Sequence, residues 1–143
     1  MDQDLFNASN YNGSKDFNQW SVRTANATGF GAAADDYAER GIDLNEQLIK
    51  NKPATFFFRV NSNAMLDAGI HKGDVVIVDR SLEPKNGSVI IAVLNGEMLI
   101  RRMQLQNAKV RLLPETKRLS AIEVDAVSNF SVWGVVTYVI HSV

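Results

Sequence analysis

Serine hydroxyls and basic side chains are the groups through which this chain could carry out nucleophilic chemistry. A serine hydroxyl is a weak nucleophile until a neighbouring base takes its proton. The chain has two histidines, His71 and His141, and no Asp/His/Ser spacing of a catalytic triad surrounds either of them. His71 stands next to Lys72 and Gly73 in a turn-forming stretch, so we interpret it as a solvated loop residue. The histidines therefore do not identify a catalytic site.

Metal and cofactor chemistry finds no support in the sequence pattern. The chain has no cysteine, which excludes disulfides and thiolate metal sites. The acidic residues Asp35, Asp36 and Asp125 do not stand in a metal-ligand spacing. We therefore expect neither a metal nor a cofactor.

The segment Phe56–Asp79 contains the elements that would position a site. Phe56–Val60 is an aromatic and β-branched run, which is typical of a strand. Val75–Val78 is a continuous apolar run, which favours a strand covered on both faces. The residues between them are too few for a full crossover helix, and one helical turn fits through Ala64–Gly69. We therefore expect two strands joined by a compact turn.

Four pairs of residues follow one another in this segment, namely Ala64-Met65, Gly69-Ile70, Gly73-Asp74 and Val78-Asp79. Their order and spacing resemble the signature of the LexA/UmuD self-cleaving serine peptidases, which are also similar to signal peptidases. In that family the residue before the methionine is the serine nucleophile, and here this position is Ala64. The resemblance implies a mostly β, small and twisted fold of the signal-peptidase-like type.

The resemblance also implies a position for the general base. The family's lysine lies on the strand after a tight hairpin, in a Gly-Glu-x-x-x-Lys pattern, and Gly96-Glu97 places Arg101 there. Lysine acts as a base where burial lowers its pKa, whereas arginine, whose pKa lies far above neutral pH, stays charged. Since Ala64 has no hydroxyl and Arg101 cannot accept a proton, we predict that the chain as written does not cut itself.

The loss of both reactive groups from an otherwise intact motif has two explanations. Deliberate inactivation would trap the uncut form, and Ala64 is interpreted as such an engineered residue. A natural pseudo-protease would have the same residues. Arg101 is compatible with a native residue, because basic pairs are frequent at this position in the family. Ser62 is a competing nucleophile candidate, but its spacing to Met65 does not match the motif, and the alternative is a turn-bonding serine.

Residues 27–34 form a small, glycine-flanked segment. Such a segment can extend into a narrow cleft, since glycine has no side chain to obstruct it. Its letters resemble the segment that follows the self-cleavage bond in the family, which implies a scissile bond between Thr28 and Gly29. Family members carry cysteine or alanine before this glycine, so threonine is a bulkier departure.

The cleavage position divides the chain into two expected parts. Residues 1–28 are expected to be an N-terminal arm that self-cleavage removes in the active form. Their composition favours a flexible arm, and Phe17 and Trp20 favour an arm docked in an extended form, because large aromatic side chains are costly to leave in water. Residues 29–143 are expected to form the peptidase-like and dimerisation domain.

The remaining pattern is mostly β. Asn95-Gly96 between apolar runs is a strong hairpin signal, because both central positions of such a turn favour positive φ. Ile42–Ile49 is typical of a short helix with Asp43 as its N-cap. The other expected strands are Ser88–Leu94, Glu97–Leu105, Lys109–Leu113, Ser120–Val124 and Ser131–Val143.

Composition limits the classes of protein. The 143 residues are 45% hydrophobic, which suits one domain with a single core. The net charge of −1 gives no global electrostatic attraction to nucleic acid. No basic-then-apolar leader opens the chain, and no apolar run approaches the roughly 18 residues needed to span a membrane. We therefore expect a soluble, cytoplasmic protein without membrane partners.

The resemblance implies partners as well as chemistry. Only 28 residues precede the expected cleavage bond, too few for the DNA-reading domain of LexA-type repressors, which favours the UmuD branch. That branch implies a homodimer whose cleavage is stimulated by a RecA–single-stranded DNA filament. It also implies that the shortened form serves a UmuC-type Y-family polymerase in error-prone translesion synthesis. The alternatives are a non-catalytic dimeric adaptor and a LexA-like transcriptional regulator without its DNA-reading domain; no sequence-specific DNA binding is expected.

Overall fold

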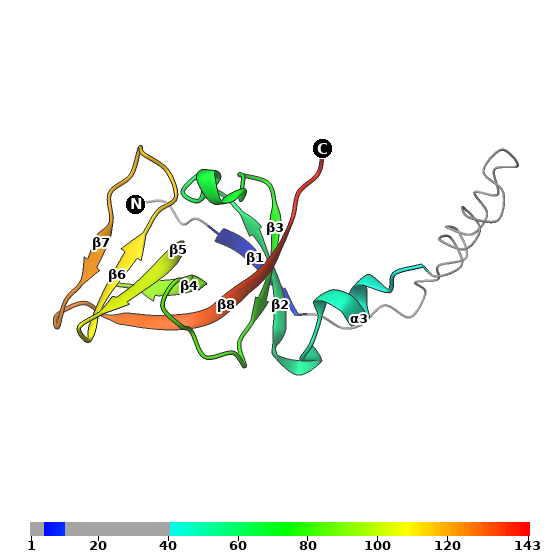
Figure 1. Ribbon diagram of the computed structural model, residues 1–143, viewed down its shortest axis with the longest axis horizontal. Coiled ribbons are helices and arrows are strands. Elements are labelled where there is room, and N and C mark those ends of the chain that lie inside the picture. The colour runs from blue at the N-terminus through cyan, green and yellow to red at the C-terminus, as the bar shows by residue number, and fades with distance from the viewer. Residues whose placement is uncertain (1–4, 11–40) are drawn as a thin grey trace, which may run out of the picture. The chain divides into compact units, whose positions relative to one another are not determined.

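The computed structural model describes residues 5–10 and 41–143. The chain divides into two units, Met1–Tyr11 with Pro53–Val143, and Asn12–Lys52. Figure 1 labels the strands and the α-helix. The elements are β1 Leu5–Asn10, α3 Leu44–Leu48, the 3₁₀ turn η1 Lys52–Ala54, β2 Thr55–Val60, the 3₁₀ turn η2 Leu66–Ala68, β3 Val75–Asp79, β4 Val89–Leu94, β5 Glu97–Gln106, β6 Lys109–Leu113, β7 Ile122–Val124 and β8 Phe130–Ile140.

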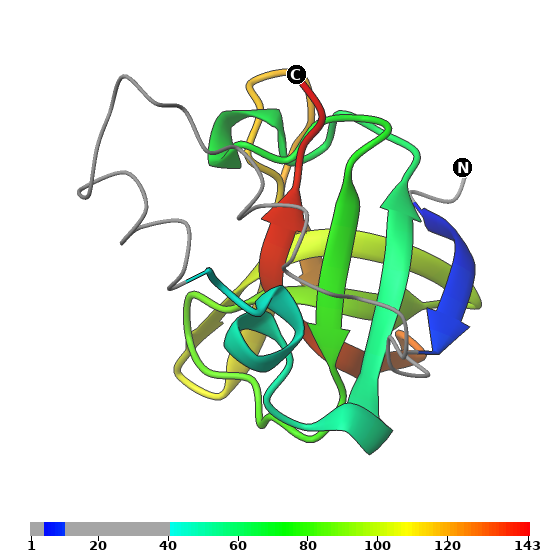
Figure 2. The ribbon, with the colours of Figure 1, turned by 90° about the vertical axis from the view of Figure 1, so that its right-hand side faces the viewer.

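Within the described residues the strands form one antiparallel sheet in the order β1-β2-β3-β8-β4-β5-β6-β7. Figure 2 shows β2, β3 and the end of β8 running side by side, with the β4–β5 hairpin crossing behind them. The expectation of a mostly β, twisted fold is confirmed. No helix of the described residues is long and apolar enough to cross a lipid bilayer.

Strand β8 joins the two halves of the sheet. Its first half pairs with β4 and its second half with β3, and Val135 faces both Ile90 and Asp79 in these ladders. The register shifts once in each ladder. Such bulges bend a strand and increase its twist, so β8 can leave one half of the sheet and enter the other.

Two hairpin turns follow from local chemistry. Asn95 and Gly96 have φ of 51° and 85°, and the β4–β5 ladder closes directly around them at Leu94 and Glu97. The sequence prediction of this hairpin is confirmed. The β5–β6 hairpin uses Asn107-Ala108 in the same way, with φ of 52° and 62°.

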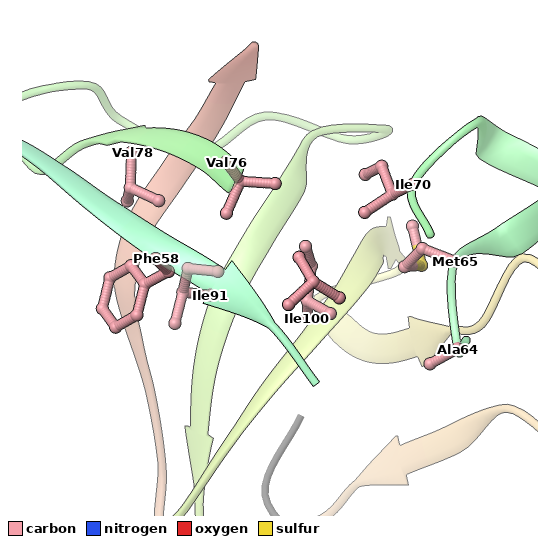
Figure 3. Packing of buried hydrophobic residues seen from close by; sticks show 9 residues of the cluster. Phe58, Ala64, Met65, Ile70, Val76, Val78, Ile91 and Ile100 are labelled. Atoms are coloured by element: carbon pink, nitrogen blue, oxygen red, sulfur yellow. The ribbon is translucent and has the colours of Figure 1, made fainter. Parts of the chain in front are cut away.

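The buried side chains gather in two clusters, because β4 and β5 carry apolar residues on both faces. The first cluster, shown in Figure 3, consists of Phe58, Val60, Ala64, Met65, Ile70, Val76, Val78, Ile91 and Ile100. The second consists of Ile90, Ala92, Leu94, Leu99, Met103, Leu112 and Val135. The compact turn expected after β2 therefore contributes directly to the first cluster.

Two elements lie before β2. Helix α3 begins after Asp43, whose carboxylate accepts hydrogen bonds from the N–H groups of Asn45 and Glu46 at 3.0 and 3.4 Å, so the predicted N-cap is confirmed. Strand β1 was missed, because the sequence shows no strand pattern within residues 1–28. Leu5–Asn10 is nevertheless extended and pairs antiparallel with β2, which shows that an edge partner can impose strand structure on a weak local pattern.

Candidate functional site

The turn that carries Ala64 is held by its own backbone. The N–H groups of Ala68 and Ile70 both donate to the Met65 carbonyl, at 3.0 and 3.2 Å. Gly69 ends the 3₁₀ turn η2 with a φ of 85°, a left-handed value that glycine adopts without steric cost. The single helical turn predicted for Ala64–Gly69 is confirmed in this compact form.

Met65 anchors this turn in the core. Its side chain is fully buried, and Ala64 retains 2% of its exposure. Figure 3 shows Met65 and Ile70 gathered next to Ile100 of β5, with which they share the first cluster. The methionine of the motif thus has a packing role: its burial holds residue 64 in place next to β5.

Ser62 takes part in the turn rather than standing free of it. Its hydroxyl accepts a hydrogen bond from the Ala64 N–H at 3.3 Å. This is the turn-bonding role that the sequence analysis gave as the alternative to a displaced nucleophile. It leaves position 64 as the better candidate for the reactive residue.

A pocket of about 320 Å³ opens beside Ala64. Its walls come from the turn after β2 and from the loop after β6. The residues that bear on the site are Ser62, Ala64, Leu66, Thr116 and Leu119. Position 64 therefore borders an accessible hollow although its methyl group is buried, and this is the arrangement that a residue needs to meet a bound chain segment.

Glu115, which sequence reasoning missed, ties this turn to β5. Its N–H donates to the Ala64 carbonyl at 2.8 Å, and its carbonyl accepts from the Asp67 N–H at 2.7 Å. Its carboxylate accepts from Arg102 Nε at 2.6 Å. One residue thus holds the backbone of position 64 and contacts the neighbour of position 101. No pattern in the sequence marks Glu115 beyond its place two residues after Leu113.

Arg101 lies inside β5 and is 5% exposed. It faces Ile90 across the β4–β5 ladder, and one of its guanidinium nitrogens donates to the Ile100 carbonyl at 2.8 Å. Burial of this kind would lower the pKa of a lysine placed here, whereas arginine remains charged. The pairing of residues 64 and 101 as a reactive dyad stays a prediction, and Thr28 and Gly29 lie outside the described residues.

His71 lies in the loop before β3 with its side chain 44% exposed, as predicted for a solvated loop residue, but it also contacts a carboxylate. Its N–H donates to Asp74 Oδ2 at 2.8 Å, and its Nδ1 atom is buried. His141 brings its Nδ1 to 2.6 Å from Asp74 Oδ1. Burial of Asp74 opposes its ionisation, but these contacts with His71 and His141 outweigh it and hold the pKa of Asp74 below its ordinary value. His71 and Asp74 lie on the same β2–β3 connection as Ala64, and His141 reaches Asp74 from just past the end of β8.

Comparisons with known proteins identify the family of the chain. Residues 22–137 match the family model described as Peptidase S24-like. Protein ImpA of Salmonella typhimurium is 38% identical over 117 residues, which are 79% of this chain and 77% of that protein. Protein MucA of Escherichia coli is 34% identical over 113 residues, 78% of this chain and 77% of that protein.

A repressor is also among the relatives. The LexA repressor of Bordetella parapertussis is 32% identical over 116 residues, which are 81% of this chain and 53% of the repressor. This chain therefore corresponds to about half of that protein. The match of the family model over most of the chain, the relatives at more than 30% identity and the β fold with its Met65 turn agree: the chain belongs to the Peptidase S24-like family, the family to which its motifs point.

Proposed function

We propose that this chain is a UmuD-type protein of SOS mutagenesis, held in its uncut form by Ala64 and Arg101. The observation that carries the proposal is the intact turn around position 64, which Glu115 joins to the β5 segment that contains position 101. The pocket, the buried Met65 and the buried basic side chain at position 101 support the proposal, because they are present although the two reactive groups are absent.

The reaction of the active form would be an acyl transfer within the chain. A serine hydroxyl at position 64 would attack the Thr28 carbonyl, and its proton would pass to a neutral lysine amine at position 101. Backbone N–H groups near residue 64 would stabilise the oxyanion. The bond between Thr28 and Gly29 then breaks, the amine of Gly29 takes the proton, and water releases residues 1–28 from the ester.

The pocket beside Ala64 supports the proposed substrate. Its lining mixes Ser62 and Thr116 with Leu66 and Leu119, which suits a segment of small residues with a polar backbone. The chain's own residues 27–34 have these properties. We therefore propose this pocket as the place where the cleavage segment of the same or a partner chain lies.

The proposed partners are a second copy of the chain, a RecA–single-stranded DNA filament and a UmuC-type Y-family polymerase, all in the cytoplasm. The C-terminal part of β8 supports a self-association surface. Tyr138 and Ile140, whose side chains lie on the same face of the strand, are 40% and 49% exposed, and neighbouring exposed apolar side chains are typical of protein interfaces. Light scattering at several concentrations tests the dimer.

The proposal is tested by restoring both groups. The variant with Ala64→Ser and Arg101→Lys, incubated with an activated RecA filament or at raised pH, should yield fragments 1–28 and 29–143 by mass spectrometry. The single variants should remain uncut, since each lacks one partner. If the double variant stays whole at every pH up to about 10, at which a lysine amine of ordinary pKa is substantially neutral, the dyad assignment is wrong.

Two other functions have some support. A non-catalytic dimeric adaptor is favoured by the residues at positions 64 and 101 as they stand, and it predicts polymerase binding without any cleavage by the double variant. A LexA-like regulator is favoured by the repressor among the relatives. The net charge of −1 disfavours DNA binding, and a gel shift with duplex DNA distinguishes this possibility.

A further inference from the structure

The register of β3 and β8 brings Asp74 and His141 together. Val75 pairs with Ile140 and Val76 with Val139 in this antiparallel ladder. One step beyond the last pair, Asp74 is the position opposite His141. Their side chains meet there, with His141 Nδ1 2.6 Å from Asp74 Oδ1.

A tight turn brings His71 to the same carboxylate. The Asp74 N–H donates to the His71 carbonyl at 3.0 Å, and the His71 N–H returns a hydrogen bond to Asp74 Oδ2 at 2.8 Å. Gly73 has a φ of 96°, the sign that the third residue of a type II turn requires. The backbone thus fixes the His71 side chain beside Asp74.

The ring nitrogen of His71 is directed into this cluster without a partner. His71 Nδ1 is buried and has no hydrogen-bond partner among the described residues, and it lies 3.6 Å from Asp74 Oδ2. The imidazole rings of His71 and His141 are 4.8 Å apart between centroids. Ligand atoms of all three residues lie within 4.8 Å of one another.

We propose that His71, Asp74 and His141 form a binding site for a divalent transition-metal ion of the Zn²⁺ class. The ligands are the two Nδ1 atoms and one carboxylate oxygen. Two imidazoles and a carboxylate are a donor set that Zn²⁺, Co²⁺ and Ni²⁺ accept. The site would connect the C-terminal end of β8 to the turn before β3.

One distance is close to that of a tetrahedral site. Ligands about 2.0–2.1 Å from Zn²⁺ are about 3.3 Å from one another, near the 3.6 Å between His71 Nδ1 and Asp74 Oδ2. The 2.6 Å contact of His141 is a hydrogen bond with the other carboxylate oxygen, Oδ1. This hydrogen bond must open, and the proton that it holds leaves to solvent when the metal binds. His141 lies just past the end of β8, where such a shift disturbs no ladder.

Some features around the cluster favour metal binding and others disfavour it. Asp74 is 4% exposed, and its contacts with the two histidines hold its pKa below the ordinary value. The side chains of His71 and His141 are 44% and 47% exposed, although the Nδ1 atom of His71 is itself buried. The Arg59 guanidinium donates to the Gly73 carbonyl at 2.8 Å, and its charge, with that of Lys72, reduces the affinity of the site.

The chain is well suited to a metal titration. Its two histidines are both in the cluster and it has no cysteine, so a tag-free preparation has no other imidazole or thiolate. The chelator-treated full chain should bind Zn²⁺ at one site by calorimetry, and Co²⁺ should give the visible absorption of a tetrahedral nitrogen-ligated ion. His71→Ala and His141→Ala should each weaken Zn²⁺ binding by more than about tenfold. Removing a residue that only hydrogen-bonds to a metal ligand already costs about that much, and here a ligand itself is removed.

Matched variants separate this site from adventitious carboxylate binding. Asp67→Asn removes an exposed acidic residue of the same loop and should leave Zn²⁺ affinity unchanged. Zn²⁺ should slow amide exchange at Ile140 in the parent chain and not in His71→Ala, whose fold is checked by circular dichroism. The proposal is overturned if the parent chain does not bind Zn²⁺ or Co²⁺, or if the variant lacking both histidines binds equally well.

Discussion

The carboxylate of Glu115 lies 2.6 Å from Arg102 Nε, while its N–H donates to the Ala64 carbonyl. The loop after β6 therefore sets the distance between the turn of residue 64 and strand β5. This relation gives a test that does not alter either proposed reactive position.

Glu115→Ala should reduce cleavage severalfold in the variant with Ala64→Ser and Arg101→Lys. The cost in the free energy of unfolding should be only about 0.5–1 kcal/mol, because both partners of the ion pair are about one-third exposed. The larger effect on rate is expected because displacements of about 1 Å are costly to a reaction. Urea denaturation and timed mass spectrometry measure the two effects. Glu115→Gln keeps a hydrogen-bond acceptor for Arg102, so its cleavage rate should lie between the rates of the double variant and of Glu115→Ala. Equal cleavage rates in these three chains would contradict a positioning role for Glu115.

Gly134→Ala should destabilise the fold by about 1–3 kcal/mol, the usual cost of overpacking a core. An added Cβ would lie 2.6 Å from Val78 Cγ1, and Val78 is fully buried with a β-branched side chain that is stiff. Thermal unfolding measures the loss. Ser131→Ala, on an exposed position of the same strand, should change stability little; a Gly134→Ala variant as stable as the parent would contradict the expected clash with Val78.

Ala108→Gly should stabilise the protein by about 0.5–1 kcal/mol. Ala108 has a φ of 62°, in the left-handed region where an alanine costs about 1–2 kcal/mol and glycine costs nothing comparable. Part of the gain is cancelled by the larger entropy of glycine in the unfolded chain. Chemical denaturation measures the change. Ala126, which is exposed and has no positive φ, is the control, and Ala126→Gly should have the opposite sign.

The Asp125 turn predicts a dependence on pH. The Ser128 hydroxyl donates to the Asp125 carboxylate at 2.9 Å and, with the N–H groups of Val127 and Ser128, holds the pKa of Asp125 below its ordinary value against the opposing effect of desolvation. Ser128→Ala should raise this pKa, as read from the carboxyl carbon in an NMR titration. A carboxylate whose pKa is lowered in the folded state stabilises the protein at pH values above its unfolded pKa of about 3.9. Ser128→Ala should therefore reduce the free energy of unfolding at neutral pH. This difference from the parent chain should vanish as pH falls through the lowered pKa. An unchanged pKa would contradict the role given to the hydroxyl.

Local elements and the family could be predicted from the residues alone. Asn95-Gly96 predicts its hairpin and Asp43 its N-cap, because turn and cap chemistry acts over a few residues. The apolar runs of β2 and β3 likewise predict buried strands. The spacing from Ala64 to Asp79 identified the family that the comparisons confirm, and the proposed roles of residues 64 and 101 come from that motif.

Contacts between residues that are distant in the sequence follow from the fold and could not be predicted from any local pattern. The β3–β8 register places Asp74 beside His141, which lies 67 positions away in the sequence, and the loop after β6 places Glu115 against Ala64. Pairing with β2 makes a strand of Leu5–Asn10, whose own pattern indicates none. These contacts depend on strand register across the sheet, and a shift of one residue in that register would turn each side chain to the other face. No local pattern encodes that choice.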